Sequence, residues 1–85
     1  METKKVNLSN KEVEVHEMLA IEFDKIISIE NATDRIASIV KSSCNFTDED
    51  YSKLTIKDRS LIMNAINELN GWLGETDFTQ KENAE

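Results

Sequence analysis

The stretch from Ser9 to Cys44 contains neither glycine nor proline and is rich in apolar side chains. Glycine and proline are the residues that most often interrupt a helix. The stretch therefore predicts one long helix over about residues 10–43. At 1.5 Å per residue this helix would be about 50 Å long, more than a compact domain of this size needs.

The start of this helix is predicted by a capping box. Ser9 is placed to cap the first turn, and the Glu12 carboxylate three residues later can reach back to the Ser9 amide. Leu8 and Val13 occupy the flanking apolar positions. Residues 1–8 are then expected to form a flexible N-terminal segment.

The apolar side chains of the long helix fall on two faces when residues are spaced by about 100°. The first face holds Val15, Leu19, Phe23, Ile26 and Ile27, and we assign it to the C-terminal helices of the same chain. The second face is formed by Met18, Ile21, Ile29, Ala32, Ile36 and Ile39. Two faces require two packing partners, so Met18, Ile29, Ile36 and Ile39 are candidate interface residues for a second copy or a target protein. We therefore expect a homodimer.

An alternative is a break in this helix near Asn31. Asn31, Thr33 or Asp34 can each cap a new helix. In that case both faces can be buried within one monomer, and the argument for a dimer largely disappears.

Two further helices are predicted after Cys44. Thr47 and Asp50 form a second capping box, which predicts a short helix over about 48–53. Thr55 and Asp58 begin a longer helix over about 56–73, whose core stripe is Ile62, Ile66, Leu69 and Leu73. Asn70-Gly71 is a competing stop signal to Gly74.

No stretch shows period-2 alternation long enough to predict a strand. The expected fold is an all-α helical bundle with a single domain over residues 9–74 and a flexible acidic tail over residues 75–85. An 85-residue chain buries only about 60% of its unfolded surface, which makes help from oligomerisation plausible for such a small core.

The net charge of −7 disfavours direct binding to nucleic acid or to an anionic membrane surface, because both attract lysine and arginine. The acidic surface serves either solubility or a basic partner. The candidate residues of such a surface are Glu14, Glu17, Asp24, Asp48, Glu49 and Asp50.

Catalytic and metal-binding signatures are missing. His16 is the only histidine and Cys44 the only cysteine, so neither a zinc site nor a disulfide is available within one chain. The sequence Gly-Trp-Leu-Gly, which contains both glycines, matches no phosphate-binding motif. We therefore expect no enzyme activity, no cofactor and no metal.

These patterns favour a small, acidic, helical protein–protein interaction module, cytoplasmic because no signal peptide or membrane span is evident. It would act as a regulator, adaptor or inhibitor, with Trp72 as a further interface candidate. Size and charge suggest a phage or mobile-element protein. One alternative is an acidic inhibitor that occupies the nucleic-acid site of its partner. A second is a dimeric helix-turn-helix-like DNA-binding regulator using the helices within 47–73, although Arg35 and Arg59 are its only guanidinium groups.

Overall fold

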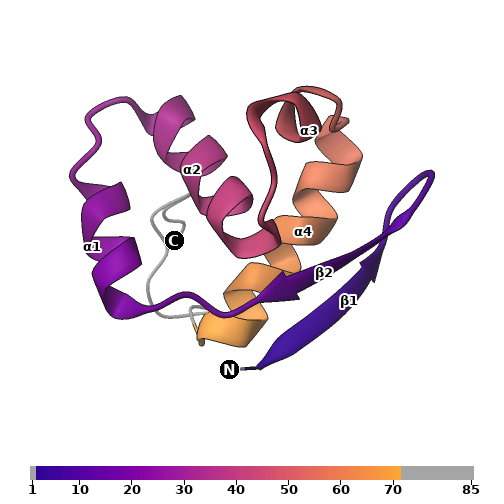
Figure 1. Ribbon diagram of the computed structural model, residues 1–85, viewed down its shortest axis with the longest axis horizontal. Coiled ribbons are helices and arrows are strands. Elements are labelled where there is room, and N and C mark those ends of the chain that lie inside the picture. The colour runs from indigo at the N-terminus through magenta and orange to yellow at the C-terminus, as the bar shows by residue number, and fades with distance from the viewer. Residues whose placement is uncertain (1, 72–85) are drawn as a thin grey trace, which may run out of the picture.

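In the computed structural model, which describes residues 2–71, a β-hairpin precedes four helices (Figure 1). The hairpin strands are β1 (Thr3–Asn7) and β2 (Glu12–His16). The helices are α1 (Ala20–Ile27), α2 (Ala32–Cys44), α3 (Asp48–Ser52) and α4 (Ile56–Asn70). The fold is thus mixed α/β, and the prediction of an all-α bundle is wrong.

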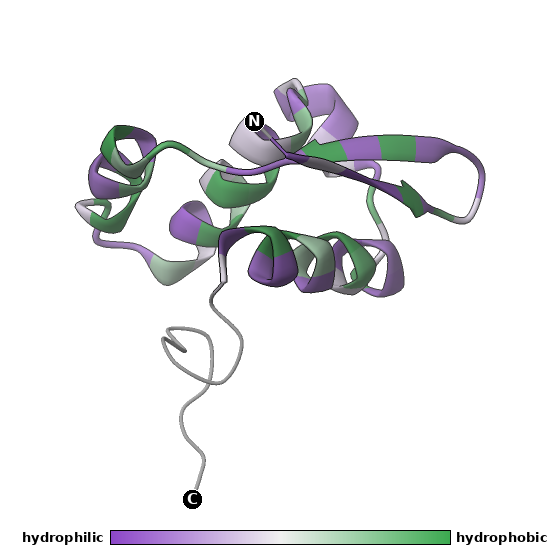
Figure 2. Cartoon of the chain, turned by 90° about the horizontal axis from the view of Figure 1, so that it is seen from below, coloured by the Kyte–Doolittle hydropathy of each residue, from purple (hydrophilic) through white to green (hydrophobic). Residues whose placement is uncertain are grey.

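The hairpin is an antiparallel pair in which Lys5 lies opposite Glu14 and Val6 opposite Val13. Polar and apolar residues alternate along β2, Glu-Val-Glu-Val-His, so that Val13 and Val15 are buried while Glu12 and Glu14 are exposed (Figure 2). The expectation that no useful alternation exists overlooked these five residues. Thr3–Asn7, expected to be part of a flexible segment, form the second strand of the pair.

Ser9 lies in the hairpin turn and does not start a helix. The Leu8 amide donates to the Lys11 carbonyl at 2.7 Å and closes this turn. The Ser9 amide and hydroxyl both donate to Oδ1 of Asp58 in the first turn of α4, at 3.2 and 3.0 Å. The polar groups of Ser9 therefore hold the hairpin against α4, which is the physical reason that the predicted cap is absent.

The predicted long helix is divided at residues 28–31, so the continuous helix over 10–43 is wrong and the alternative break near Asn31 is confirmed. The Asn31 side chain accepts from the Asp34 amide at 3.0 Å and caps α2. Arg35 donates to the carbonyls of Ile29 and Glu30 at 2.5 and 3.0 Å. These bonds satisfy backbone groups that a continuous helix would have paired.

The capping predictions for α3 and α4 are confirmed. Thr47 and Asp50 form the expected reciprocal box, and the Thr55 hydroxyl accepts from the Asp58 amide at 3.1 Å. α4 ends at Asn70, because Gly71 adopts a left-handed conformation with φ of 70°. The competing stop signal is thus the one used, and Gly74 lies outside the described residues.

The core lies between the hairpin and the helices. β2 packs on α2 and α4, β1 packs on α4, and α1 packs on α2 (Figure 1). The buried apolar residues are Val6, Val13, Val15, Ile26, Ile39, Val40, Cys44, Ile62, Ala65 and Ile66. One core therefore includes residues from both ends of the described chain. Within residues 2–71, no helix has the length and apolar character needed to cross a membrane.

Candidate interaction surfaces

The acidic candidates lie on several elements and are not gathered in one place. Glu14 is exposed on β2, Asp24 is exposed on α1, and Glu17 follows β2 with Oε2 accepting from the Glu2 amide at 3.0 Å. The other three acids are on α3, which is separated from α1 by α2 (Figure 1).

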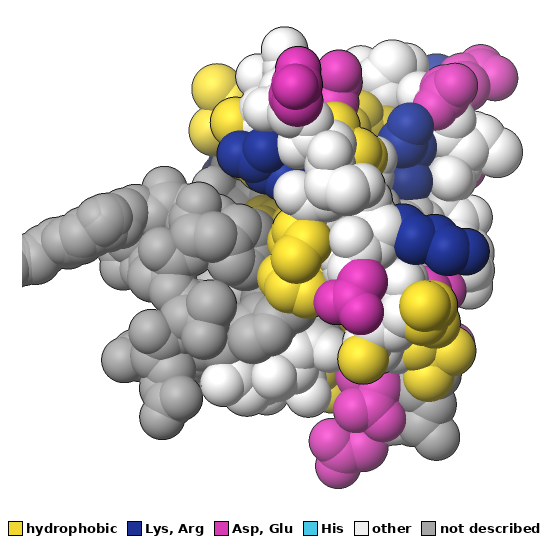
Figure 3. Space-filling model, turned by 90° about the vertical axis from the view of Figure 1, so that its left-hand side faces the viewer, with side chains coloured by type: hydrophobic (Ala, Val, Ile, Leu, Met, Phe, Trp, Pro, Cys, Tyr) yellow, Lys and Arg dark blue, Asp and Glu magenta, His cyan; other side chains and the backbone are white. Residues whose placement is uncertain are grey.

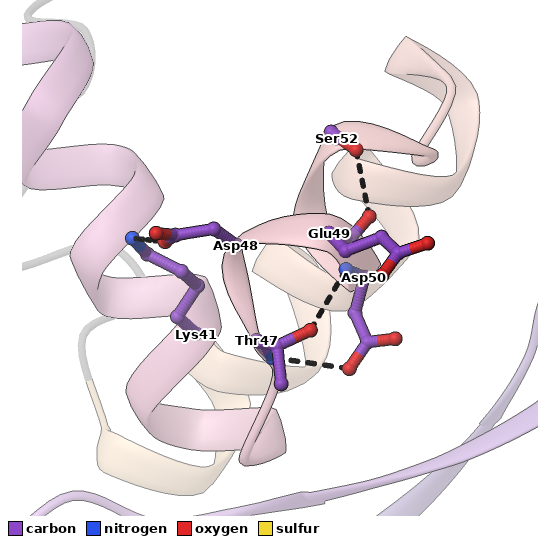
Figure 4. Close-up of polar contacts among 6 residues, drawn as sticks. All are labelled: Lys41, Thr47, Asp48, Glu49, Asp50 and Ser52. Carbon is purple, nitrogen blue, oxygen red and sulfur yellow. Dashed lines mark hydrogen bonds and ion pairs between the residues drawn. The ribbon is translucent and has the colours of Figure 1, made fainter.

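The three acids of α3 have local interactions, and Figure 4 shows those of Asp48 and Asp50. Asp48 pairs with Lys41 at 2.6 Å, Glu49 pairs with Lys53 at 3.3 Å, and Asp50 accepts from the Thr47 amide at 3.0 Å. The hydrogen bond from Lys41 lowers the pKa of Asp48, and the hydrogen bond from the Thr47 backbone lowers that of Asp50. The three acids therefore serve mainly to stabilise the first turn of α3.

The predicted interface residues do not form one free face. Ile39 is 1% exposed and belongs to the core. Met18 is half-buried against the core, and its amide donates to Oδ1 of Asn70 at 2.9 Å. Ile29 and Ile36 are also half-buried. Trp72 lies outside the described residues.

Three of the five exposed large hydrophobic residues within residues 2–71 are on and beside α1. Leu19 is 52%, Ile21 60% and Ile27 50% exposed, and within residues 2–71 the remaining exposed large hydrophobic residues are Ile56 and Leu61. At about 100° per residue, Leu19 and Ile27 share the side of the buried Ile26, whereas Ile21 lies roughly opposite. Figure 3 views the α1 end of the molecule and shows hydrophobic side chains reaching the surface between charged ones.

The sequence pattern predicted that Leu19 and Ile27 are buried, because it placed them on a long helix that packs against the C-terminal helices of the chain. α1 packs against α2 and against no other helix or strand of the described chain. Within the eight residues of α1 only Ile26 is buried, so α2 covers only part of the apolar side of α1. We refer to Leu19, Ile21 and Ile27 together as the α1 surface, although these residues lie around the helix and do not share one side of it.

The two arginines are engaged within the chain. Arg35 bonds to the carbonyls that precede α2, as described above, and Arg59 donates to the Tyr51 hydroxyl at 3.2 Å. α3 and α4 do follow each other as a short and a long helix. Arg59 uses only Nη1 in this contact and keeps other N–H donors, but two arginines and lysines such as Lys57 are few cations for a DNA-binding role.

Pockets lined by described residues lie beside α4. One, of about 300 Å³, lies between the hairpin turn and the α3–α4 connection and is lined by Leu8, Ser9, Asn10, Lys11, Asp50, Lys53, Leu54, Thr55 and Asp58. Its lysines and carboxylates balance, so it has no evident preference for a charged ligand. The second, of about 230 Å³, lies between α2 and α4 and is lined by Ile36, Arg59, Ser60, Met63, Asn64 and Asn67.

His16 and Cys44 have local structural surroundings. Nδ1 of His16 donates to the Glu17 carbonyl at 2.8 Å. Cys44 is buried at the end of α2, and this burial raises the pKa of its thiol to about 11, against a smaller opposing effect of Lys11. Among the described residues, no three His, Cys, Asp or Glu side chains come together in a way that suits a metal ion.

Comparison of the chain with known protein families, curated proteins and solved structures gives no match.

Proposed function

We propose that this chain is a small acidic protein–protein interaction module that acts in the cytoplasm as a regulator, adaptor or inhibitor, without catalytic activity. The single observation that carries this proposal is the α1 surface. Three large aliphatic side chains within nine residues stay half or more exposed, on and beside a helix that packs on only one neighbour in the described chain.

Exposed aliphatic residues that occur singly need no explanation. Three of them within nine residues, on two sides of one short helix, support a partner that contacts α1 from more than one side and gains free energy by covering them. Burying apolar area contributes about 25 cal/mol per Å². The charged residues Glu22, Asp24 and Lys25 lie among these side chains and supply the polar surroundings typical of an interface rim.

The partner that we propose is a different protein. The homodimer expected from the sequence rested on a 50 Å helix, and two shorter helices replace its C-terminal part. Ile39 is now buried within one chain, which removes a central residue of the proposed subunit contact.

The acidic inhibitor that imitates nucleic acid receives less support. It requires a continuous negative surface, and the six acids are divided between the hairpin side, α1 and α3. Three of them are also used at the start of α3 or in ion pairs there.

The test is affinity capture from the native host with three tagged chains: the wild type, an Ile21→Ser/Ile27→Ser variant, and Ile56→Ser as a matched control. Ile56 is 77% exposed at the start of α4, away from α1. We expect the wild type and the control to retain the same protein and the double variant to lose it. The isolated pair is then measured by calorimetry.

Equal capture by all three chains would contradict the assignment of the interface to α1. Circular dichroism of each variant checks that the fold is retained, since the exposed positions of both isoleucines should tolerate serine with little loss of stability.

A further inference from the structure

The outer edge of β1 is a row of backbone groups that have no backbone partner within residues 2–71. The Glu17 amide donates to the Glu2 carbonyl, and the Leu8 amide donates to the Lys11 carbonyl. With the observed register, these bonds make Lys4–Val15 and Val6–Val13 the hydrogen-bonded pairs of the ladder. The N–H and C=O groups of Thr3, Lys5 and Asn7 therefore point away from β2.

These outward groups have no backbone partner among residues 2–71. Thr3, Lys5 and Asn7 are all exposed, and β1 lies at the rim of the molecule in Figure 1. α2 packs on β2 and makes no contact with β1, so the helix layer leaves the β1 side of the hairpin more open than the β2 side. An extended segment can reach this edge.

The charge of β1 is opposite to that of the whole chain. Lys4 and Lys5 are adjacent in a protein whose net charge is −7. Lys4 forms an ion pair with Glu68 of α4, whereas Lys5 is on the outer face of the hairpin and has no ion pair among the described residues. A strand added at this edge would place its side chains beside Lys5.

We propose that the β1 edge binds an extended acidic peptide segment of a partner protein by strand addition. The backbone groups of Thr3, Lys5 and Asn7 supply the hydrogen bonds. Opposite charges on neighbouring strands stabilise a sheet and like charges destabilise it, so Lys5 selects for acidic residues. A second β1 strand is a poor partner, because it would bring lysines together on one edge.

This edge is separate from the α1 surface, and either can fail while the other holds. The probe is a synthetic peptide with the sequence of residues 12–17, Glu-Val-Glu-Val-His-Glu, whose first four residues alternate acidic and apolar. Its matched control carries lysine at the three glutamate positions. The full chain is labelled with ¹⁵N and titrated with each peptide.

The expected result is an alternating pattern along β1. The acidic peptide should shift and protect from exchange the amides of Thr3, Lys5 and Asn7, whereas the already paired amides of Lys4 and Val6 should keep their exchange rates. The control peptide should bind about threefold to tenfold more weakly, because a cross-strand attraction to Lys5 becomes a repulsion.

Two variants of Lys5 separate the hydrogen bonds from the charge. Lys5→Pro removes an outward donor while leaving the internal ladder bonds in place, and should abolish binding with the circular dichroism spectrum retained. Lys5→Glu should reverse the preference between the two peptides. Four outcomes would each overturn the proposal. They are amide shifts that do not alternate along β1, exchange changes centred on Val13 and Val15 of β2, equal binding of both peptides, and no binding.

Discussion

Asp58 connects two parts of the chain that lie 49 residues apart in sequence. Asp58 is 6% exposed, and its carboxylate accepts hydrogen bonds from the amide and the hydroxyl of Ser9. Its own backbone amide donates to the Thr55 hydroxyl. A buried carboxylate is stable when hydrogen bonds replace its lost hydration. At the residue scale, this group joins the hairpin turn to the start of α4.

Asp58→Ala should lower the free energy of unfolding by about 1–3 kcal/mol, because it removes the charged acceptor of two hydrogen bonds from Ser9. Urea denaturation followed by circular dichroism measures the change. Asp24→Ala is the control, since Asp24 is exposed on α1 and should change stability by less than about 0.5 kcal/mol. Similar losses for both variants would show that the Ser9 contact contributes little.

Cys44 should react slowly with thiol reagents at pH 8 in the folded chain and quickly in urea. Burial raises its pKa from an ordinary 9.0 to about 11, so the reactive thiolate is scarce in the native state. Absorbance-monitored disulfide exchange with and without urea tests this. Fast reaction of the native chain would mean that the end of α2 opens readily.

The same shift predicts a pH dependence of stability. A group whose folded pKa lies above its unfolded value favours folding below that unfolded value, and this contribution is lost as pH rises toward the folded pKa. Stability should therefore fall between about pH 9 and 11. The Cys44→Ala variant, compared over the same pH range, should lack this component.

At the element scale, the division between α1 and α2 depends on Asn31. Its side chain caps α2, and Arg35 holds the two carbonyls just before that cap. Both interactions are local, which is why the sequence near Asn31 indicated a helix break there as an alternative to a continuous helix. The tertiary structure adds the reason that α1 turns away, since Ile26 and Ile39 enter the same core.

Asn31→Ala should destabilise the chain by about 0.5–2 kcal/mol, the usual effect of losing a side-chain N-cap. Asn10→Ala, in the exposed hairpin turn, is the comparison variant. Thermal unfolding of the two proteins measures the difference. An unchanged melting temperature for Asn31→Ala would indicate that tertiary packing alone defines the break.

At the scale of the whole molecule, the hairpin and the helices depend on each other. An isolated two-stranded hairpin is marginal in water. Here Val6, Val13 and Val15 are buried together with Ile62 and Ile66 of α4. The small core is therefore expected to unfold as one cooperative unit.

Ile62→Ala should cost about 2–5 kcal/mol, because Ile62 is fully buried and a cavity would remain. Leu61→Ala is the neighbouring control, at a residue 38% exposed. Urea unfolding measures the cost. Amide exchange in the Ile62→Ala variant should accelerate in β2 as well as α4. Acceleration confined to α4 would contradict a single cooperative core.

The sequence by itself determined the caps at Thr47 and Thr55, whose causes are local, and it offered the cap at Asn31 and the stop at Gly71 as alternatives to a continuous helix and to an end at Gly74. Each depends on groups within a few residues of one another. The tertiary structure decided that residues 3–16 form a hairpin, because their valines need α2 and α4 as a packing surface and Ser9 needs Asp58 as an acceptor. Five alternating residues and a possible capping box are compatible with either a strand or a helix start, and only distant contacts distinguish the two. The same distant contacts buried Ile39 and left Leu19, Ile21 and Ile27 exposed, so the candidate interaction surface was a property of the fold.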